Sequence, residues 1–327
     1  MTGLYSILHF LVDGVCAWAM LGRLSGDYGG ILIYNFCAFA MQLPLGAVLD
    51  RLEGRKTPLR IAALGCCLTL LGAFTGPAVL GIGNALFHVG GGVDVIREDA
   101  EKGLSGQALG VFVAPGALGL FLGGLIGQSS PLLLIPAGLA MALLLRPIRG
   151  SEGALPEPTR KHPLWLFAAC FAVVVLRSHV GMTAVFPWKS GVLAFLAVAA
   201  VVLGKMAGGV LAARFGPKGT TVLSLSLAAA GFLLGDYPFF GLLALLCFNM
   251  TMPLTLYALW RRFPANPGAC FGSLTLALFL GFLPTYFGLE LPIGGAPGSV
   301  LSLILLWKAV DDDASDLCPI PGADAAP

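Results

Sequence analysis

Charged residues are scarce in this chain of 327 residues. Asp, Glu, Lys and Arg make up 11% of it and hydrophobic residues 57%, whereas a soluble domain carries about 25% charged residues. The mean hydropathy is +0.89. A water-soluble particle of this size cannot bury so much apolar surface, so the composition excludes a soluble enzyme, a nucleic-acid binder and a disordered protein. It predicts a protein that crosses a lipid bilayer many times.

Motifs for a disulfide framework, a structural metal site or intramembrane catalysis are also missing. The chain has eight cysteines, nearly all in apolar runs, without CxxC or Cys/His ligand spacing. The apolar runs contain no HExxH, GxSxG or paired-aspartate motif, so we expect neither an enzyme nor a bound cofactor. No Lys or Arg precedes the first apolar run, at residues 4–21. That run is therefore not a typical signal peptide, and we expect it to be a membrane-spanning helix.

What the chain has is a series of apolar runs, each near the roughly 20 residues that a helix needs to cross a bilayer. Glycine, proline and charge clusters separate these runs. The runs lie at residues 4–22, 28–49, 58–76, 77–96, 106–127, 131–147, 164–186, 191–213, 219–235, 238–260, 267–288 and 294–309. We therefore predict an all-α polytopic membrane protein of twelve transmembrane helices.

The positions of the positive charges support this count. With both termini in the cytoplasm, all but four of the 19 Lys and Arg residues fall on the cytoplasmic side, as the positive-inside rule describes. The exceptions are Arg23 and Lys189 outside and Arg177 and Lys205 within helices. The hydrophilic stretch at 148–163 predicts a cytoplasmic linker between an N-terminal bundle, 1–147, and a C-terminal bundle, 164–309. The acidic segment at 310–327 is predicted to be a disordered cytoplasmic tail.

The two halves repeat each other, as in many transporters. The segment at 46–56, after the second run, aligns with 209–218, after the eighth, when Glu53 is treated as an insertion. The aligned pairs are Gln42 with Lys205, Gly46 with Gly209, Arg51 with Arg214, Gly54 with Gly216, His88 with Asn249 and Gly110 with Gly272. These pairs occur in order at a constant six-helix offset, which favours two pseudo-symmetric bundles.

Residues 46–56 resemble the signature loop of the major facilitator superfamily, Gly-x-x-x-Asp-Arg-x-Gly-Arg-Arg/Lys, with one extra residue. The resemblance covers residues 4–309 and implies two six-helix bundles that rock around a central cavity. It implies that Asp50 and Arg51 latch the cytoplasmic side. The gating-loop residues that it implies are Gly46, Asp50, Arg51, Gly54, Arg55, Arg214 and Gly216. The opening His9-Phe10-x-x-Asp13 and the Phe87-His88 pair also resemble the fosmidomycin-resistance-like branch.

Ionisable residues inside a span are costly and are therefore functional candidates. His9 and Asp13 are four residues apart on one helix face, and we predict that they carry the coupled proton. A packed pair that does not titrate is the alternative. Arg177 lies near the middle of its span and needs a counter-ion, a water-filled cavity or an anionic solute. We predict that it pairs with Asp13 at rest and that a solute anion competes for it; a purely structural link is the alternative.

The other predicted solute-binding residues are polar groups within the spans. They are His88, Asn249, His179, Lys205 and Gln42. His179 lies roughly 200° around the helix from Arg177, so only one of the two is expected to face the cavity. Two alternatives to solute binding stay open. The Lys205 side chain can extend toward the cytoplasm, and His88 can form a hydrogen bond to a neighbouring helix.

Together these features predict a monomeric secondary transporter, coupled to protons, that moves a small anionic or zwitterionic solute. The short loops favour a bacterial inner membrane as its location. Two alternatives stay open at this point. One is an exporter of drugs or metabolites with an apolar cavity. The other is a divalent-metal carrier that uses His9, Asp13, His88 and His179, because imidazole and carboxylate suit such ions.

Overall fold

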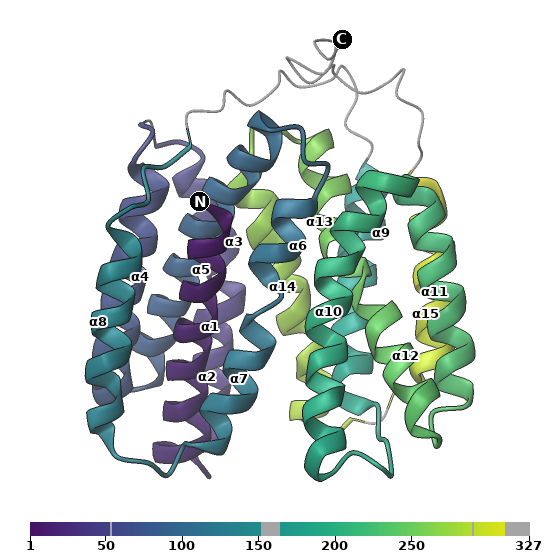
Figure 1. Ribbon diagram of the computed structural model, residues 1–327, viewed down its shortest axis with the longest axis horizontal. Helices are drawn as coiled ribbons and strands as arrows, with labels where there is room; N and C mark the ends of the chain where they lie inside the picture. Colours follow the sequence, from purple (N-terminus) through teal and green to yellow (C-terminus); the bar gives the residue numbers. More distant parts are fainter. Residues whose placement is uncertain (53, 152–163, 290, 311–327) are drawn as a thin grey trace. The chain divides into compact units, whose positions relative to one another are not determined.

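The computed structural model describes residues 1–52, 54–151, 164–289 and 291–310 (Figure 1). Most of the predicted linker, 152–163, and the predicted tail from residue 311 lie outside the described residues. All regular structure in the described residues is helical. Helical segments coincide with all twelve predicted runs, with ends that differ by a few residues, so the predicted all-α class is confirmed.

Several helices that match the first six runs are interrupted. The first run is α1 (Thr2–Trp18) and η1 (Ala19–Arg23), and the second is α2 (Tyr28–Asn35), η2 (Phe36–Ala40) and α3 (Gln42–Leu49). The third and fourth are α4 (Thr57–Thr75) and α5 (Pro77–Glu101). The fifth is α6 (Gln107–Val113) and α7 (Gly116–Leu125), and the sixth is η3 (Pro131–Leu133) and α8 (Leu134–Leu145).

The remaining six runs form α9 (Leu164–Thr183), α10 (Gly191–Phe215), α11 (Pro217–Leu233), α12 (Pro238–Asn249) with α13 (Thr251–Arg262), α14 (Pro267–Tyr286) and α15 (Gly295–Ala309). Proline is the first residue of α5, α11, α12 and α14. It suits this position because its missing N–H would have no partner in the first turn. The same prolines separate the apolar runs in the sequence, which explains why the predicted helix ends are accurate.

Nine helical stretches in the described residues are long and apolar enough to cross a membrane. The other three predicted spans form shorter helices, Pro131–Leu145, Pro217–Leu233 and Gly295–Ala309. At 1.5 Å per residue, such helices are shorter than a hydrocarbon core of about 30 Å. They require local thinning of the bilayer or polar flanking residues that reach to its surface.

The helices pack into two units. As far as the chain is described, the first unit comprises Met1–Glu101, Pro115–Ala154 and Asn266–Leu276, and the second comprises Lys102–Ala114, Leu155–Ala265 and Ala277–Pro327. The chain therefore changes units inside the fifth span, between α6 and α7, and inside the eleventh, within α14. The predicted bundle boundaries at 1–147 and 164–309 stay a prediction.

In the first unit, α1 packs against both α5 and α7. Tyr5 of α1 donates a hydrogen bond to Asp94 Oδ2 of α5 at 2.7 Å. On the other side, Gly119 of α7 contacts the carbonyl of Phe10 so closely that a Cβ would collide with it. Such small residues let helix backbones approach each other in a membrane, and they fix the face of α1 that is turned toward α5 and α7.

In the second unit, α10 packs against α6 and α12, and α11 packs against α12 and α15. The span from 238 to 262 breaks at Asn249 and Met250. Pro253, in the first turn of α13, has no N–H to donate to the Asn249 carbonyl. The break places Asn249, which is half-buried, at the end of α12.

Candidate functional site

The first unit contains a buried cluster of four polar side chains, His9, Asp13, Asn84 and His88, which we call the His–Asp cluster. His9 Nε2 and Asp13 Oδ2 are 3.1 Å apart on one face of α1, so the predicted shared face is observed. From α5, Asn84 Nδ2 donates to Asp13 Oδ1 at 3.0 Å. His88, one turn further along α5, places its Nε2 2.8 Å from His9 Nε2.

Hydrogen-bond geometry restricts the protonation of this cluster. His88 Nδ1 lies 2.8 Å from the carbonyl oxygen of Asn84, which only accepts, so Nδ1 carries a hydrogen. The facing Nε2 atoms of His88 and His9 then share one hydrogen, with one ring as donor and the other as acceptor. With both rings neutral, the Asp13 carboxylate leaves one negative charge in a buried site, which is unfavourable. One added proton removes this charge, so the cluster is suited to hold a single exchangeable proton.

Three metal-ligating groups also meet in the His–Asp cluster, since donor atoms of His9, Asp13 and His88 lie within 4.8 Å of one another. Tetrahedral zinc, with Zn–N distances of about 2.0–2.1 Å, holds two ligand nitrogens roughly 3.3 Å apart. The two Nε2 atoms are closer than this, at 2.8 Å, which is a hydrogen-bond distance. The arrangement therefore suits a shared proton better than a metal ion.

The start of α7 closes the His–Asp cluster. Gly116, directly after the break at Pro115, contacts His9 Nε2 and Asp13 Oδ2 so closely that a Cβ would collide with both. The chain also passes from the second unit to the first at Pro115. The protonatable groups therefore contact the point at which the fifth span changes units.

Replacing Gly116 by alanine tests this contact. The added methyl group would displace His9 or Asp13, at a cost of about 1–3 kcal/mol for overpacking. We expect Gly116→Ala to lower the thermal stability of the purified protein. Gly124→Ala, in the same helix, is the control, because its Cβ would meet only the end of the Leu21 side chain at 3.0 Å. Equal stability of the two variants would contradict the contact.

One residue of the predicted gating loop, Asp50, caps a helix of the first unit. Asp50, directly after α3, accepts hydrogen bonds from the backbone N–H groups of Gly268, at 2.7 Å, and Ala269, at 2.8 Å, in the first turn of α14. A carboxylate at this position also interacts favourably with the helix dipole. Burial raises the pKa of Asp50 above its usual range, against the opposing effect of the two N–H groups and Arg97. Burial therefore opposes the charged form of Asp50, and the two N–H groups favour it.

Removing this cap tests whether Asp50 holds the start of α14. Loss of a helix cap costs about 1–2 kcal/mol, which corresponds to a factor of roughly 5–30 in an opening equilibrium. We expect Asp50→Ala to speed hydrogen–deuterium exchange at Gly268 and Ala269 by that factor. The matched control is Asp27→Ala, because Asp27 accepts from Gly30 N at 2.8 Å and caps α2 instead. Exchange at Gly268 and Ala269 that is identical in wild type and Asp50→Ala would refute the cap.

Gly46 shares this contact, because a Cβ on it would collide with the Gly268 carbonyl, whereas the other gating-loop residues lie elsewhere. Arg51 is exposed, and Arg55 Nε donates to the backbone carbonyl of residue 150, where the predicted linker begins, at 3.2 Å. In the second copy, the Arg214 guanidinium lies 5.5 Å from the centre of the neighbouring phenyl ring. Gly54 and Gly216, which the repeat aligns, both have positive φ, +112° and +80°. Glycine adopts this conformation without strain, and its presence at both positions agrees with the repeat.

Residues that the repeat aligns also form equivalent close contacts between helices within each unit. In the first unit Gly272 contacts the Gln42 carbonyl, and in the second unit Gly110 lies against the Lys205 carbonyl, where a Cβ would be 2.7 Å from the oxygen. The Gln42 side chain is fully buried, and Lys205 Nζ lies 3.4 Å from the Val113 carbonyl. Both of these predicted solute-binding residues thus lie at helix contacts.

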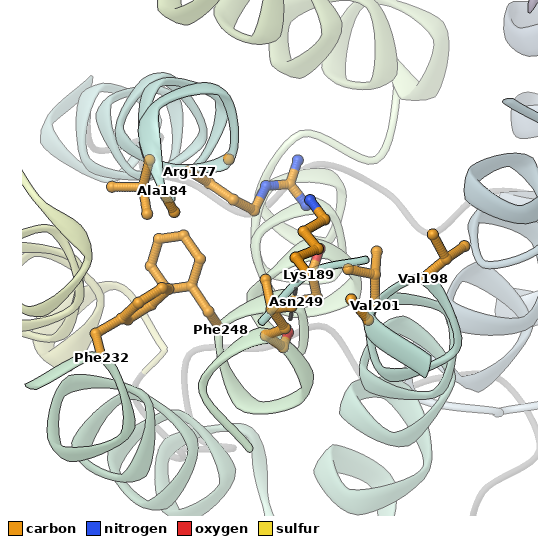
Figure 2. Close-up of a pocket in the computed structure, with 12 residues that line it drawn as sticks. Arg177, Ala184, Lys189, Val198, Val201, Phe232, Phe248 and Asn249 are labelled. Atoms are coloured by element: carbon orange, nitrogen blue, oxygen red, sulfur yellow. Dashed lines mark hydrogen bonds between the residues drawn. The ribbon is translucent and has the colours of Figure 1, made fainter. Parts of the chain in front are cut away.

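A cavity of about 230 Å³ lies within the second unit, between α9, α10, α11 and α12. Figure 2 shows the Arg177 and Lys189 side chains pointing toward one another in this cavity, beside Asn249 at the end of α12. Arg177 is 8% exposed, whereas Lys189 is exposed in the loop after α9. The cavity therefore has one cation in its interior and another at its mouth.

Both cations in the cavity lack a counter-ion in the part of the chain that the structure describes. Within the described residues, neither the Arg177 nor the Lys189 side chain has a hydrogen bond or an ion pair. The surrounding walls are apolar and include Val198 and Val201 on one side and the Phe232 and Phe248 rings on the other (Figure 2). A buried guanidinium retains its charge and needs a partner of opposite charge. An anion from solution is the ligand that this arrangement can bind.

The remaining predicted residues are distributed between the units. His179 is buried, does not line the cavity of Arg177, and has no partner for either ring nitrogen within the described residues. Asp13 and Arg177 belong to different units, as do His88 and Asn249, so both predicted pairings stay predictions. Sequence reasoning missed Lys189, because it is a loop residue, and Asn84, which is uncharged. The i, i+4 spacing of Asn84 and His88 is a signal that could have identified Asn84.

Comparisons with known proteins bear on the fold. No sequence-family profile and no curated protein matches the chain. Solved structures do match. The E. coli fucose:proton symporter FucP has a TM-score of 0.58 and 13% identity, over 94% of this chain and 96% of that one. A structure of FucP in the outward conformation, described as a major facilitator superfamily transporter, has a TM-score of 0.53 and 14% identity, over 94% and 97%.

A human protein gives a similar match. The human organic anion transporter MFSD10 (TETRAN) has a TM-score of 0.58 and 18% identity, over 94% of both chains. None of these matches bears on the fosmidomycin-resistance-like branch, which stays a prediction. At these identities the likeness concerns the fold, and it covers nearly all of the chain. The chain therefore has the fold of the major facilitator superfamily transporters, in which twelve transmembrane helices form two bundles.

Proposed function

We propose that this chain is a secondary transporter that moves a small anionic solute by alternating access and couples the movement to protons. The observation that carries the proposal is the cavity of the second unit, in which buried Arg177 has no counter-ion among the described residues. The fold supports the transporter class. The chain would be a multi-pass protein of a bacterial inner membrane, monomeric and with both termini in the cytoplasm.

The solute-binding role rests on charge and burial. Arg177 is too basic to become neutral, and leaving it unpaired in an apolar cavity is costly. A bound anion relieves this cost. Asn249 lines the same cavity, and its Nδ2, which donates to the Leu245 carbonyl at 2.8 Å, carries a second hydrogen. We assign solute binding to Arg177 and Asn249.

The proton-coupling role rests on the His–Asp cluster. Asp13 Oδ2 contacts His9, and Asp13 Oδ1 accepts a hydrogen bond from Asn84. His88 Nε2 lies 3.7 Å from Asp13 Oδ1. A proton on either imidazole is stabilised by the carboxylate, and the short Nε2–Nε2 distance allows the two rings to exchange it. We therefore assign His88, with His9 and Asp13, to the proton site.

Coupling between the two sites would use the fifth span and α14, in which the chain changes units. Protonation changes the packing of His9 and Asp13 on Gly116, where the fifth span changes units. Opening of the Asp50 contact would release the start of α14, the other helix that changes units. The predicted competition between Asp13 and a solute anion for Arg177 stays a separate prediction, which this coupling does not require.

An exporter with an apolar cavity is the second candidate, because the Phe232, Phe248, Val198 and Val201 walls would also accept a lipophilic molecule. A thermal-shift screen of the full detergent-purified chain separates the candidates, since a ligand that binds only the folded state raises its apparent stability. Organic anions, organic cations, sugars and divalent metals would be compared. The proposal expects stabilisation by organic anions. Stabilisation only by lipophilic cations favours the exporter, and stabilisation only by metals favours the metal carrier; either result would overturn the anion assignment.

A further inference from the structure

We infer that the cavity of the second unit selects organic anions with a doubly charged headgroup and a compact apolar body, and that Lys189 is the residue that recognises the second charge. This inference rests on the proposed function and specifies its substrate class. Lys189 is not part of the predicted solute-binding set. It enters here because its side chain points toward Arg177 within the same cavity (Figure 2).

Two cations whose charged ends point toward one another repel unless an anion lies between or beside them. The described part of the chain supplies none, because neither the Arg177 nor the Lys189 side chain has an ion pair there. A ligand with one negative charge compensates one of the two cations. A headgroup with two negative charges compensates both, so it is the ligand charge that matches the site.

The rest of the cavity determines the body of the ligand. Phe232 and Phe248 stand edge to face, with ring centres 5.5 Å apart, and Val198 and Val201 lie on the other side (Figure 2). These walls offer no charge and favour an apolar or aromatic group. Inorganic phosphate would leave them in contact with water. The class is therefore an amphipathic dianion, such as an aromatic phosphate monoester.

The positions of the two cations assign different roles to them. Arg177 is buried and is required for any anion that reaches the interior of the cavity. Lys189 is exposed at the mouth, where it attracts anions from solution and contacts the part of the headgroup that Arg177 does not cover. Loss of Lys189 should therefore reduce the preference for a second charge without abolishing anion binding.

Three probes of matched structure test the inference by calorimetry on the full purified chain. Phenyl phosphate carries close to two charges at about pH 7.5; benzenesulfonate has the same ring and one charge; inorganic phosphate lacks the ring. We expect wild type to bind phenyl phosphate at least about tenfold more tightly than either of the others. Lys189→Met should weaken phenyl phosphate binding about tenfold and benzenesulfonate binding less than about threefold, because one of two cation–anion contacts is lost.

The control is Lys218→Met, which removes a lysine of the same unit that lies over the Trp307 ring and does not line the cavity. It should leave all three affinities unchanged. Equal binding of phenyl phosphate and benzenesulfonate by wild type would overturn the inference, and so would an equal loss of both affinities in Lys189→Met.

The two failures can be told apart. If benzenesulfonate and phenyl phosphate bind equally well and both require Arg177, the anion cavity stands and the dianion preference is wrong. If wild type binds neither aromatic anion, or binds them without any need for Arg177, the solute-binding part of the proposed function fails as well.

Discussion

Asp13→Asn is expected to abolish proton-driven solute accumulation while leaving solute binding intact. The substitution keeps the size of the side chain but removes the charge that stabilises a proton on His9 or His88. Without the carboxylate, a proton added to the buried cluster leaves an uncompensated positive charge, which is unfavourable. Uptake of labelled solute into proteoliposomes with an imposed pH gradient measures the effect. Calorimetry on the same variant measures binding.

The control for this prediction is Asp27→Asn, which removes the charge of an aspartate that caps α2 outside the cluster. It should transport at the wild-type rate. His88→Gln should resemble Asp13→Asn, because it removes one of the two rings that share the proton. Proton-driven accumulation that survives in Asp13→Asn would show that the cluster is a packed hydrogen-bonded group with no role in coupling.

Arg177→Gln is expected to abolish anion binding. Truncating one member of a buried charge pair costs about 2–5 kcal/mol, which corresponds to a factor of roughly 30 to several thousand in affinity. Binding of phenyl phosphate by calorimetry measures the loss. Arg177→Lys should keep part of the affinity, because it preserves the charge but not the planar guanidinium. Wild-type affinity in Arg177→Gln would contradict the anion cavity.

The stability of the same variant distinguishes a binding role from a structural one. A structural link between Arg177 and a carboxylate predicts that Arg177→Gln lowers the melting temperature, because it leaves the carboxylate unpaired. Removal of a buried charge that has no partner among the described residues should instead leave the melting temperature of the ligand-free protein unchanged or raise it. Loss of binding together with retained stability is therefore the result that a binding site requires.

The helices of this protein are predictable because their signals are local. The length of each apolar run and the prolines at the starts of α5, α11, α12 and α14 depend only on neighbouring residues. The gating loop was predicted from its motif, and Asp50 contacts the start of α14, whereas Arg51 is exposed. A motif indicates which residues act near one another. It does not indicate which of them accepts the hydrogen bonds.

The sites are less predictable because they depend on which helices pack together. Spacing places His9 and Asp13 on one face of α1, but only the contact between α1 and α5 brings His88 to 2.8 Å from His9. The repeat alignment instead paired His88 with Asn249. Lys189 lies in a loop, where a positive charge is ordinary, and only the folded second unit places it in the same cavity as Arg177 (Figure 2).

Proton movement driven by a solute anion tests the central claim most directly. Proteoliposomes that contain the full chain and an internal pH dye would receive phenyl phosphate on the outside. The account predicts a change of internal pH that requires the protein and falls to the protein-free rate in both Asp13→Asn and Arg177→Gln. An internal pH that stays at the protein-free baseline with wild type, or that changes equally in wild type and both variants, would contradict it.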